Sequence, residues 1–221
     1  MLRRAGLMDF NALSLECAPW VAPRTMAAIV KTESQFNPLA ININGGARLE
    51  RQPASKQEAV VTAKWLLANN YNIDVGLGQV NSTNLSKTNL SIEDAFNPCK
   101  NIAAAATILQ WNYKAASKKI PGEQAALNAA ISAYNTGSFS RGFSNGYVKK
   151  VLNNVPKEVP AIETQKAAIA PIGLVGNLKR EEAEVKKLTP QNNEVVKLKA
   201  SKESAFTIYD GNSANRAVMV Y

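Results

Sequence analysis

Apolar residues recur at helical spacing in several parts of the chain. Residues 9–18 place Phe10, Leu13 and Cys17 at i, i+3 and i+7, which predicts a short helix with one apolar face that ends before Pro19. The same reasoning predicts helices at 101–118, 123–135 and 146–155. The last of these carries an apolar stripe that we expect to close the packed domain.

A further helix is predicted from Pro23 to Glu33 or Ser34. Proline suits a first helical turn, and Asn37-Pro38 disfavours helical geometry just beyond the other end. Its apolar stripe consists of Met26, Ile29 and Val30. Glu33 stands at i+7 of this stripe, so the pattern places a carboxyl group on the apolar face of the last turn.

Shorter segments alternate as strands do. Residues 39–52 alternate apolar and polar positions on both sides of Asn44-Gly45-Gly46, which predicts a hairpin with positive φ at its turn, and residues 71–75 alternate as well. Ser55 and Glu58 form a capping box that opens a helix through about residue 68. The predicted fold class is therefore α+β, mainly α, with a small antiparallel sheet.

The chain changes character after residue 155. We expect one domain at 1–155, followed by a polar, flexible C-terminal tail at 156–221 that is disordered or weakly helical, with a weak helical run near 180–188. A second small domain is the alternative for the tail.

Composition removes several kinds of chemistry. Histidine is absent from all 221 residues, which excludes Ser-His-Asp triads, Cys-His pairs and His-based metal sites. Cys17 and Cys99 are too few for a structural zinc site, and form either one disulfide or two buried thiols. We expect no metal site and no cofactor.

The net charge of +9 suits a polyanionic partner such as nucleic acid, anionic lipid or an acidic cell-wall polymer. The first 155 residues hold sixteen Lys/Arg and nine Asp/Glu, so most of this charge belongs to the domain. The basic residues are dispersed and follow no nucleic-acid-binding motif, which argues against a nucleic-acid partner. No apolar run approaches the ~20 residues of a membrane span, and we expect none.

The N-terminus begins with an arginine pair, but Asp9, Asn11 and Glu16 interrupt the apolar region that a secretory signal needs. We therefore expect that no export signal is encoded in these residues.

Glu33 is the candidate for acid–base chemistry. A helix C-terminus and an apolar stripe both disfavour a negative charge, so both raise the pKa of a carboxyl group. A carboxyl group that stays protonated near neutral pH is what general-acid cleavage of a glycosidic bond requires. The alternative is a frayed helix whose Glu33 points into solvent.

Two other stretches are typical of loops that build a site. Residues 74–81, DVGLGQVN, contain two glycines that allow a bound chain to approach the backbone, and present Gln79 and Asn81, whose amides suit sugar groups. Residues 130–137 place Tyr134 at the end of an apolar stripe, before the C-cap Gly137. The structural alternatives are an ordinary turn for residues 74–81 and a core tyrosine for Tyr134.

Taken together, ES at 33–34 followed by FNPLA, GLGQVN at 76–81 and AYNTG at 133–137 resemble the three ordered motifs of the lysozyme-like lytic transglycosylases. ECAP around Cys17, NPCKN around Cys99 and SRGFSNGYVKKV at 140–151 resemble more narrowly the members that accompany bacterial type IV secretion systems. The resemblance covers about residues 9–155.

The resemblance implies cleavage of peptidoglycan glycan strands between N-acetylmuramic acid and N-acetylglucosamine, with a 1,6-anhydromuramoyl product. Glu33 would be the catalytic acid and base, with Asp74 the candidate if a second carboxylate takes part. The implied substrate-binding residues are Ser34, Gly76, Leu77, Gln79, Asn81, Tyr134 and Asn135. This sequence departs from the usual motif at Gly78 and Val80, where the family commonly has Met and Ile.

The resemblance also implies a periplasmic location and, because that compartment is oxidising, a Cys17–Cys99 disulfide. Type IV secretion system components are the implied protein partners. The alternatives are a non-catalytic peptidoglycan-binding module and a lysozyme-type hydrolase.

Overall fold

Helices make up most of the described part of the chain, which in this computed structural model covers residues 8–157, 161–162 and 173–176. The helices are α1 (Phe10–Cys17), α2 (Pro23–Ser34), α3 (Lys56–Ala68), α4 (Ile92–Ala95), α5 (Pro98–Ser117), α6 (Glu123–Thr136), α7 (Arg141–Ser144) and α8 (Tyr147–Asn153), with a 3₁₀ turn η1 at Ser82–Asn84. The strands are β1 (Met8–Asp9), β2 (Ile41–Ile43), β3 (Ala47–Leu49), β4 (Ile73–Val75), β5 (Val80–Asn81), β6 (Ala161–Ile162) and β7 (Leu174–Gly176). The predicted class, mainly α with a small antiparallel sheet, is confirmed.

Local signals account for most helix boundaries. Asp9 caps α1 by accepting a hydrogen bond from the backbone N–H of Asn11, and Ser55 caps α3 by accepting one from Glu58. Gly137 ends α6 in the left-handed conformation, as its position predicts. The helix predicted at 101–118 begins three residues earlier, because Asn97 is its N-cap and Pro98 occupies its first turn.

The three-stranded sheet has the order β2-β4-β5, and both pairs are antiparallel. The predicted hairpin between β2 and β3 is wrong, because β2 pairs with β4 and β3 pairs with β7. The Gln52 side chain explains the difference. Its amide accepts from the Ile41 N–H at 2.8 Å and donates to the Ile41 carbonyl at 3.0 Å, so it satisfies the edge of β2 that a hairpin partner would use.

Two short strands come from beyond residue 155. β6 pairs with β1 and β7 pairs with β3, both antiparallel, and Glu50 donates a backbone hydrogen bond to the Gly173 carbonyl. The domain boundary at 155 stays a prediction. The weak helical run near 180–188 lies outside the described residues.

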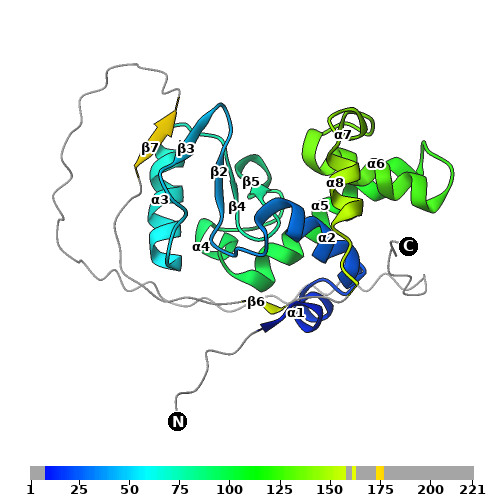
Figure 1. Cartoon of the computed structure of the whole chain (residues 1–221), viewed down its shortest axis with the longest axis horizontal. Helices are drawn as coiled ribbons and strands as arrows, with labels where there is room; N and C mark the ends of the chain where they lie inside the picture. Colours follow the sequence, from blue (N-terminus) through cyan, green and yellow to red (C-terminus); the bar gives the residue numbers. More distant parts are fainter. Residues whose placement is uncertain (1–7, 158–160, 163–172, 177–221) are drawn as a thin grey trace, which may run out of the picture. The chain divides into compact units, whose positions relative to one another are not determined.

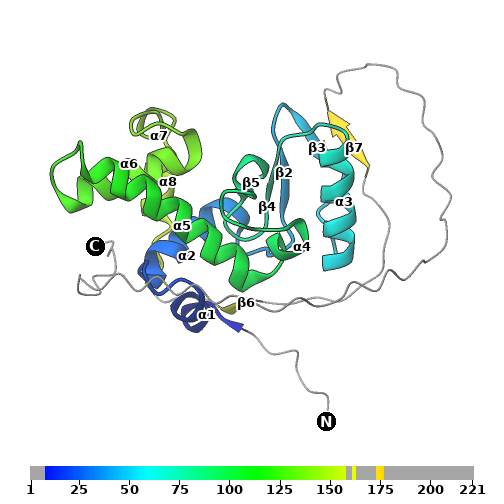
Figure 2. The same ribbon diagram turned by 180° about the vertical axis from the view of Figure 1, so that it is seen from behind.

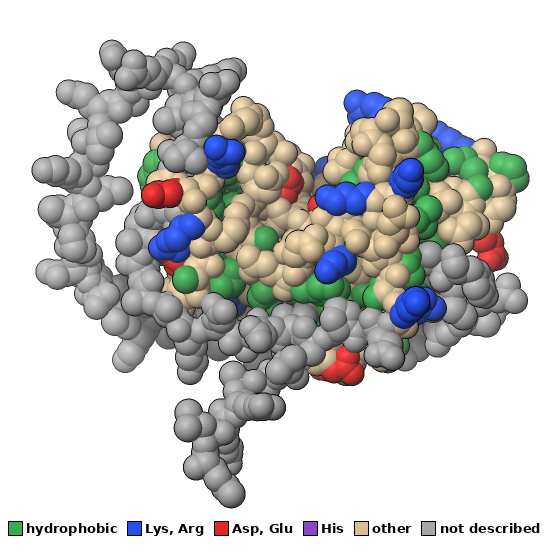
Figure 3. Space-filling view, viewed as in Figure 1, with side chains coloured by type: hydrophobic (Ala, Val, Ile, Leu, Met, Phe, Trp, Pro, Cys, Tyr) green, Lys and Arg blue, Asp and Glu red, His purple; other side chains and the backbone are tan. Residues whose placement is uncertain are grey.

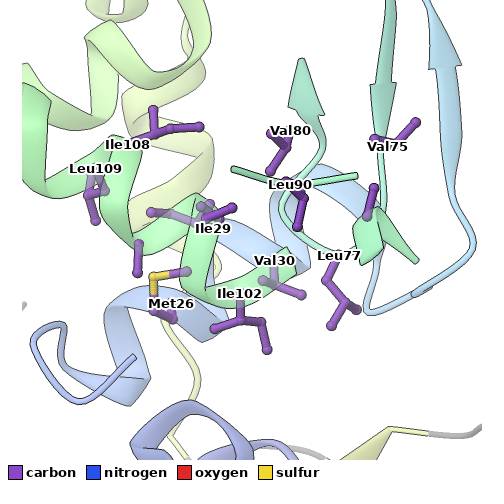
Figure 4. Packing of buried hydrophobic residues seen from close by; sticks show 14 of the residues in the cluster. Met26, Ile29, Val30, Val75, Leu77, Val80, Leu90, Ile102, Ile108 and Leu109 are labelled. Atoms are coloured by element: carbon purple, nitrogen blue, oxygen red, sulfur yellow. The ribbon is translucent and has the colours of Figure 1, made fainter. Parts of the chain in front are cut away.

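One hydrophobic core joins the helices to the sheet. Met26, Ile29 and Val30 of α2 are fully buried, as their spacing predicts, and pack with residues of α5 such as Ile102 and Leu109 (Figure 4). Figures 1 and 2 show α2 and α5 between the sheet on one side and α6, α7 and α8 on the other. The last turn of α2 therefore lies where these two sides meet.

A disulfide joins Cys17, the last residue of α1, to Cys99 in the first turn of α5. The two cysteines are 82 positions apart in the sequence and their Cα atoms are 5.2 Å apart. The predicted pairing is confirmed. Among the described helices, none combines the length and the apolar character that a membrane crossing requires.

Candidate active site

A polar cleft of about 990 Å³ lies between the sheet side and the helical side of the domain. Figure 3 shows the hollow in the surface, with acidic side chains inside it. Among the described residues that line it, Glu33 and Asp74 are the only carboxylates and Lys87 and Lys150 the only cations. Asparagine and glutamine side chains supply much of the remaining wall.

Glu33 reaches this cleft because α2 ends abruptly. Gln35 and Phe36 both adopt positive φ, 55° and 65°, so the chain leaves the helix axis immediately after Ser34. The Ser34 hydroxyl donates a hydrogen bond to the Val30 carbonyl at 3.2 Å, within the last turn of α2. Ser34 is nearly buried and lines the cleft beside Glu33.

The surroundings of Glu33 favour its protonated form. Burial is the largest influence on the pKa of Glu33 and raises it, the negative charge of Asp74 acts in the same direction, and the resulting pKa is about 7. A hydrogen bond from Tyr147 and the positive charge of Lys150 lower the pKa without cancelling the effect of burial. Near neutral pH this carboxyl group can therefore both donate and accept a proton.

Tyr147, the first residue of α8, donates a hydrogen bond from its hydroxyl to Oε1 of Glu33. Burial and the charge of Glu33 raise the pKa of the Tyr147 hydroxyl, which therefore remains a donor. Tyr147 was not among the predicted site residues. Its place four residues before Val151, on the apolar stripe of the predicted helix 146–155, is the signal that could have revealed it.

Tyr134 connects α6 to the loop before β5. Its hydroxyl donates to the Gly78 carbonyl at 2.6 Å, and burial raises its pKa well above the usual range. The charges of Glu33 and Asp74 raise this pKa as well, and Tyr134 lines the same cleft as both carboxyl groups. Asn135 follows in the cleft wall with an exposed side chain, so the AYN segment borders the site as expected.

Gly76 and Leu77 are not among the described residues that line the cleft, although both were expected to bind substrate. Leu77 is fully buried in the core. A Cβ atom on Gly76 would lie 2.3 Å from Nδ2 of Asn101. The glycines of this loop therefore let α5 approach the backbone, where a bound glycan had been expected.

Asn101 supports the loop from beneath. This buried side chain donates to the carbonyls of Val75 and Ala95 at 2.9 and 2.8 Å and accepts from the Gly78 N–H at 2.8 Å. Gln79 then faces the cleft with φ of 48°, and its amide donates to the carbonyls of Ala40 and Gly76. Sequence reasoning missed Asn101, because its bonds to Val75 and Gly78 span 26 and 23 positions of the sequence.

Asn81 and Asp74 belong to an amide-rich cluster on the cleft face of the sheet. Asn81 donates to Oδ1 of Asp74 at 2.7 Å and Asn44 donates to Oδ2 at 2.9 Å. Asn42 makes a longer contact of 3.4 Å to the same Oδ2. These partners of Asp74 are all side-chain amides.

Trp111 of α5 is the exposed aromatic residue of the cleft wall in the described part of the chain, with 42% of its surface accessible. Its apolar ring contrasts with the amide side chains that supply much of the cleft wall. The helical pattern at 101–118 predicts the helix but does not distinguish Trp111 from other surface positions. Lys87 and Lys150 were also missed, because nothing in the sequence pattern distinguishes them from other exposed lysines.

Comparison with known proteins identifies the family of this chain. The family model described as "Transglycosylase SLT domain" matches residues 10–155. The chain belongs to the transglycosylase SLT domain family. The matched region contains both the cleft and the disulfide.

Several relatives of this SLT-domain chain bear type IV secretion names. It is 44% identical over 172 residues to the type IV secretion system protein virB1 of Brucella suis, a match that covers 75% of this chain and 70% of the relative. The corresponding protein of Brucella abortus is 48% identical over 152 residues, covering 66% and 63%. Protein virB1 of Agrobacterium fabrum is 43% identical over 155 residues, covering 70% and 62%. No solved structure matches the chain.

The cleft of this SLT domain combines one carboxyl group near its protonation midpoint with one fixed carboxylate and many neutral amides. The first can exchange a proton with a bound molecule near pH 7. The amides and Trp111 suit the hydroxyl, acetamido and ring groups of a sugar chain. A polar glycan with a cleavable glycosidic bond fits this combination.

Proposed function

We propose that the protein is a peptidoglycan lytic transglycosylase that cleaves the β-1,4 bond between N-acetylmuramic acid and N-acetylglucosamine and leaves a 1,6-anhydromuramoyl end. The observation that carries this proposal is Glu33, a carboxyl group with a pKa raised to about 7 inside a polar cleft of about 990 Å³. Membership of the SLT family supports the reaction class.

In the first step the protonated Glu33 donates its proton to the glycosidic oxygen. The C1–oxygen bond breaks, the electron pair leaves with that oxygen, and positive charge develops at C1 of the muramoyl ring. The resulting Glu33 carboxylate then takes the proton of the muramoyl 6-hydroxyl while that oxygen bonds to C1. Glu33 ends protonated, so one carboxyl group serves both steps.

Tyr147 donates a hydrogen bond to one oxygen of Glu33 and so restrains the orientation of the carboxyl group that lines the cleft. Gln79 and Asn81 present amide groups for sugar hydroxyl and acetamido groups, while Tyr134 and Asn135 border the acid from α6. Ser34 steadies the last turn of α2 through its bond to the Val30 carbonyl. In this proposal Gly76 and Leu77 support the loop and do not touch the glycan.

The cellular role we propose is local opening of the cell wall for assembly of a type IV secretion system. This rests on the Brucella relatives that are named for that system, of which the matches cover 63% to 70%. The periplasm is the compartment in which peptidoglycan and a stable disulfide occur together. Peptidoglycan glycan strands are then the substrate, and secretion system components are the partners.

Digestion of purified sacculi tests the proposal. The wild-type protein should release muropeptides that are lighter by one water than the hydrolytic products. Glu33→Gln, which keeps size and hydrogen bonding but cannot transfer the proton, should lower the rate at least about 100-fold while sacculus binding persists. Glu93→Gln removes an exposed carboxylate paired with Lys64, away from the cleft, and should retain full activity.

Two results would contradict the proposal. Products with a reducing end would identify a lysozyme-type hydrolase. Sacculus binding without any product from the wild-type protein would identify a non-catalytic binding module.

A further inference from the structure

The cleft carries two positive charges that the proposed proton transfers do not use. Among the described residues that line it, Lys87 and Lys150 are the only cations. Lys87 follows the 3₁₀ turn η1 on the sheet side, and Lys150 belongs to α8 on the helical side. Transfer of a proton to and from Glu33 assigns no role to either ammonium group.

Lys150 lies on the cleft face of α8. It stands three residues after Tyr147, and residues at this spacing share one face of a helix. Tyr147 bonds Glu33 from that face. Burial raises the pKa of Glu33, and the charge of Lys150 lowers it in part. The neighbouring Lys149 is also exposed but is not among the described residues that line the cleft.

Lys87 presents the second charge from the sheet side. Its ammonium group lies 3.4 Å from Oδ1 of Asn84, which is longer than an ordinary hydrogen bond. Lys87 and Lys150 are both exposed, and no ion pair within the described part of the chain includes either of them. Both ammonium groups can therefore pair with negative charge that a ligand brings into the cleft.

The proposed substrate carries such charge on its peptide stems. The sugar rings of a peptidoglycan strand are N-acetylated and uncharged, and the lactyl group of each muramoyl residue is joined through an amide to a stem peptide with free carboxyl groups. Neutral side-chain amides suit the sugar rings, whereas a lysine ammonium group suits a carboxylate. The cleft therefore offers one kind of group for the glycan and another for the stems that leave it.

We propose that Lys87 and Lys150 recognise the stem peptides, each pairing with a free stem carboxylate, so that the enzyme prefers strands whose stems are charged. This inference rests on the proposed function. The two lysines bind substrate and take no part in proton transfer, so Glu33 remains the acid and the base. Because both lysines are exposed and water screens their charges, each pair contributes modestly and the two together set the preference.

A matched pair of glycan substrates tests this recognition. Un-cross-linked strands with acetylated stem amines are compared with the same strands after their stem carboxyl groups are converted to methylamides. Assays at about pH 6 keep Glu33 mainly protonated, because its pKa is about 7 and removal of the Lys150 charge raises it. The measured quantity is the preference ratio, which is kcat/KM for the carboxylate strands divided by kcat/KM for the methylamide strands.

The wild-type preference ratio should be about ten and should fall as ionic strength rises from about 0.05 M to about 0.5 M. Lys87→Gln and Lys150→Gln should each lower the ratio about threefold, and the double variant should bring it to about one. The control is a second double variant, Lys119→Gln with Lys149→Gln. It removes the same net charge from exposed positions outside the described cleft lining and should keep the wild-type ratio.

Three results would overturn the inference: a wild-type ratio of about one, a wild-type ratio in the Lys87/Lys150 double variant, or an equal loss in the control double variant. If the first double variant does not fold, an unchanged ratio in both single variants overturns it instead. In each case, anhydromuramoyl products that disappear with Glu33→Gln would leave the proposed function standing. Products with a reducing end, or no product from either substrate, would defeat the proposed function and this inference with it.

Discussion

The hydroxyl of Tyr147 donates a hydrogen bond to Oε1 of Glu33, across 114 positions of sequence. The bond joins the first residue of α8 to the last turn of α2. It lowers the pKa of Glu33, while burial raises it by a larger amount. Tyr147 therefore orients the carboxyl group and moderates its pKa.

Tyr147→Phe should lower kcat by about tenfold, because a carboxyl group that loses its partner also loses its fixed orientation. Loss of the bond should also raise the pKa of Glu33 above about 7 and move the alkaline limb of the pH profile upward. Tyr113→Phe, at a half-buried position of α5 outside the cleft lining, is the matched control. An unmoved limb in Tyr147→Phe would show that the bond does not act on Glu33.

Local signals predicted the position of Glu33 correctly, but not its surroundings. Pro23, the apolar stripe and Asn37-Pro38 act within α2 and its flanks, so this helix and its end could be derived from the sequence. The contact with Tyr147 depends on how α2 and α8 pack, and no local periodicity encodes that packing.

The same distinction explains the error at β2. Alternation predicted the strands, but the partner of each strand depends on which group satisfies its edge. The Gln52 side chain satisfies the outer edge of β2, and the pairing of β3 with β7 joins residues far apart in the sequence. Asn101 was missed similarly, because its buried bonds become visible only when α5 lies beneath the loop.

Stability should depend on pH through Glu33. Its pKa in the folded protein, about 7, lies above its ordinary value of 4.5, so its favourable contribution is complete below pH 4.5 and is lost as pH rises through 7. Relative to wild type, Glu33→Gln should therefore gain about 3 kcal/mol of unfolding free energy between pH 4.5 and pH 8.

Urea unfolding at the two pH values measures this difference. Glu16→Gln, at an exposed position of α1, is the control, and it should change the free energy of unfolding by the same amount at both pH values. A pH-independent difference for Glu33→Gln would mean that burial does not raise the pKa of Glu33.

Trp111 should contribute to glycan binding. Its exposed ring lies in the cleft wall, where the apolar face of a sugar can cover it and exclude water. Trp111→Ala should weaken binding of inactive Glu33→Gln protein to sacculi by about tenfold, since burial of part of an indole is worth roughly 1.5 kcal/mol.

Trp65 of α3 provides a matched control, since it is also 42% exposed but lies outside the cleft lining, stacked on Tyr71. Trp65→Ala in the same background should bind sacculi as tightly as the parent. Equal losses in the two variants would point to general apolar adsorption.

The disulfide should stabilise the folded domain by restricting the unfolded chain. Replacing both Cys17 and Cys99 by alanine should cost about 4 kcal/mol of unfolding free energy, from the chain-entropy model for a loop of this length. Guanidinium unfolding with and without a reductant measures this. Reductant should destabilise the wild type and leave the double variant unchanged, and an unaffected wild type would contradict the expectation.

Replacing Gly78 by methionine, the residue that the family commonly has at this position, should be unfavourable in this protein. A Cβ atom here would lie 2.5 Å from Cβ of Ala105 and 3.1 Å from the Tyr134 hydroxyl, so α5 leaves no space for a side chain. Gly78→Met should destabilise the protein by about 1–3 kcal/mol, which is typical of overpacking. It should also lower activity, because the Tyr134 bond to the Gly78 carbonyl would shift.

Ala105→Gly tests whether this contact is the cause. Alone it should cost about 1 kcal/mol, as glycine does in a helix interior. Combined with Gly78→Met it should recover part of the lost stability, which a double-mutant cycle of unfolding free energies reports as a favourable coupling. Strictly additive effects would mean that Ala105 is not the obstacle, and that Gly78 is required for the path of the loop backbone.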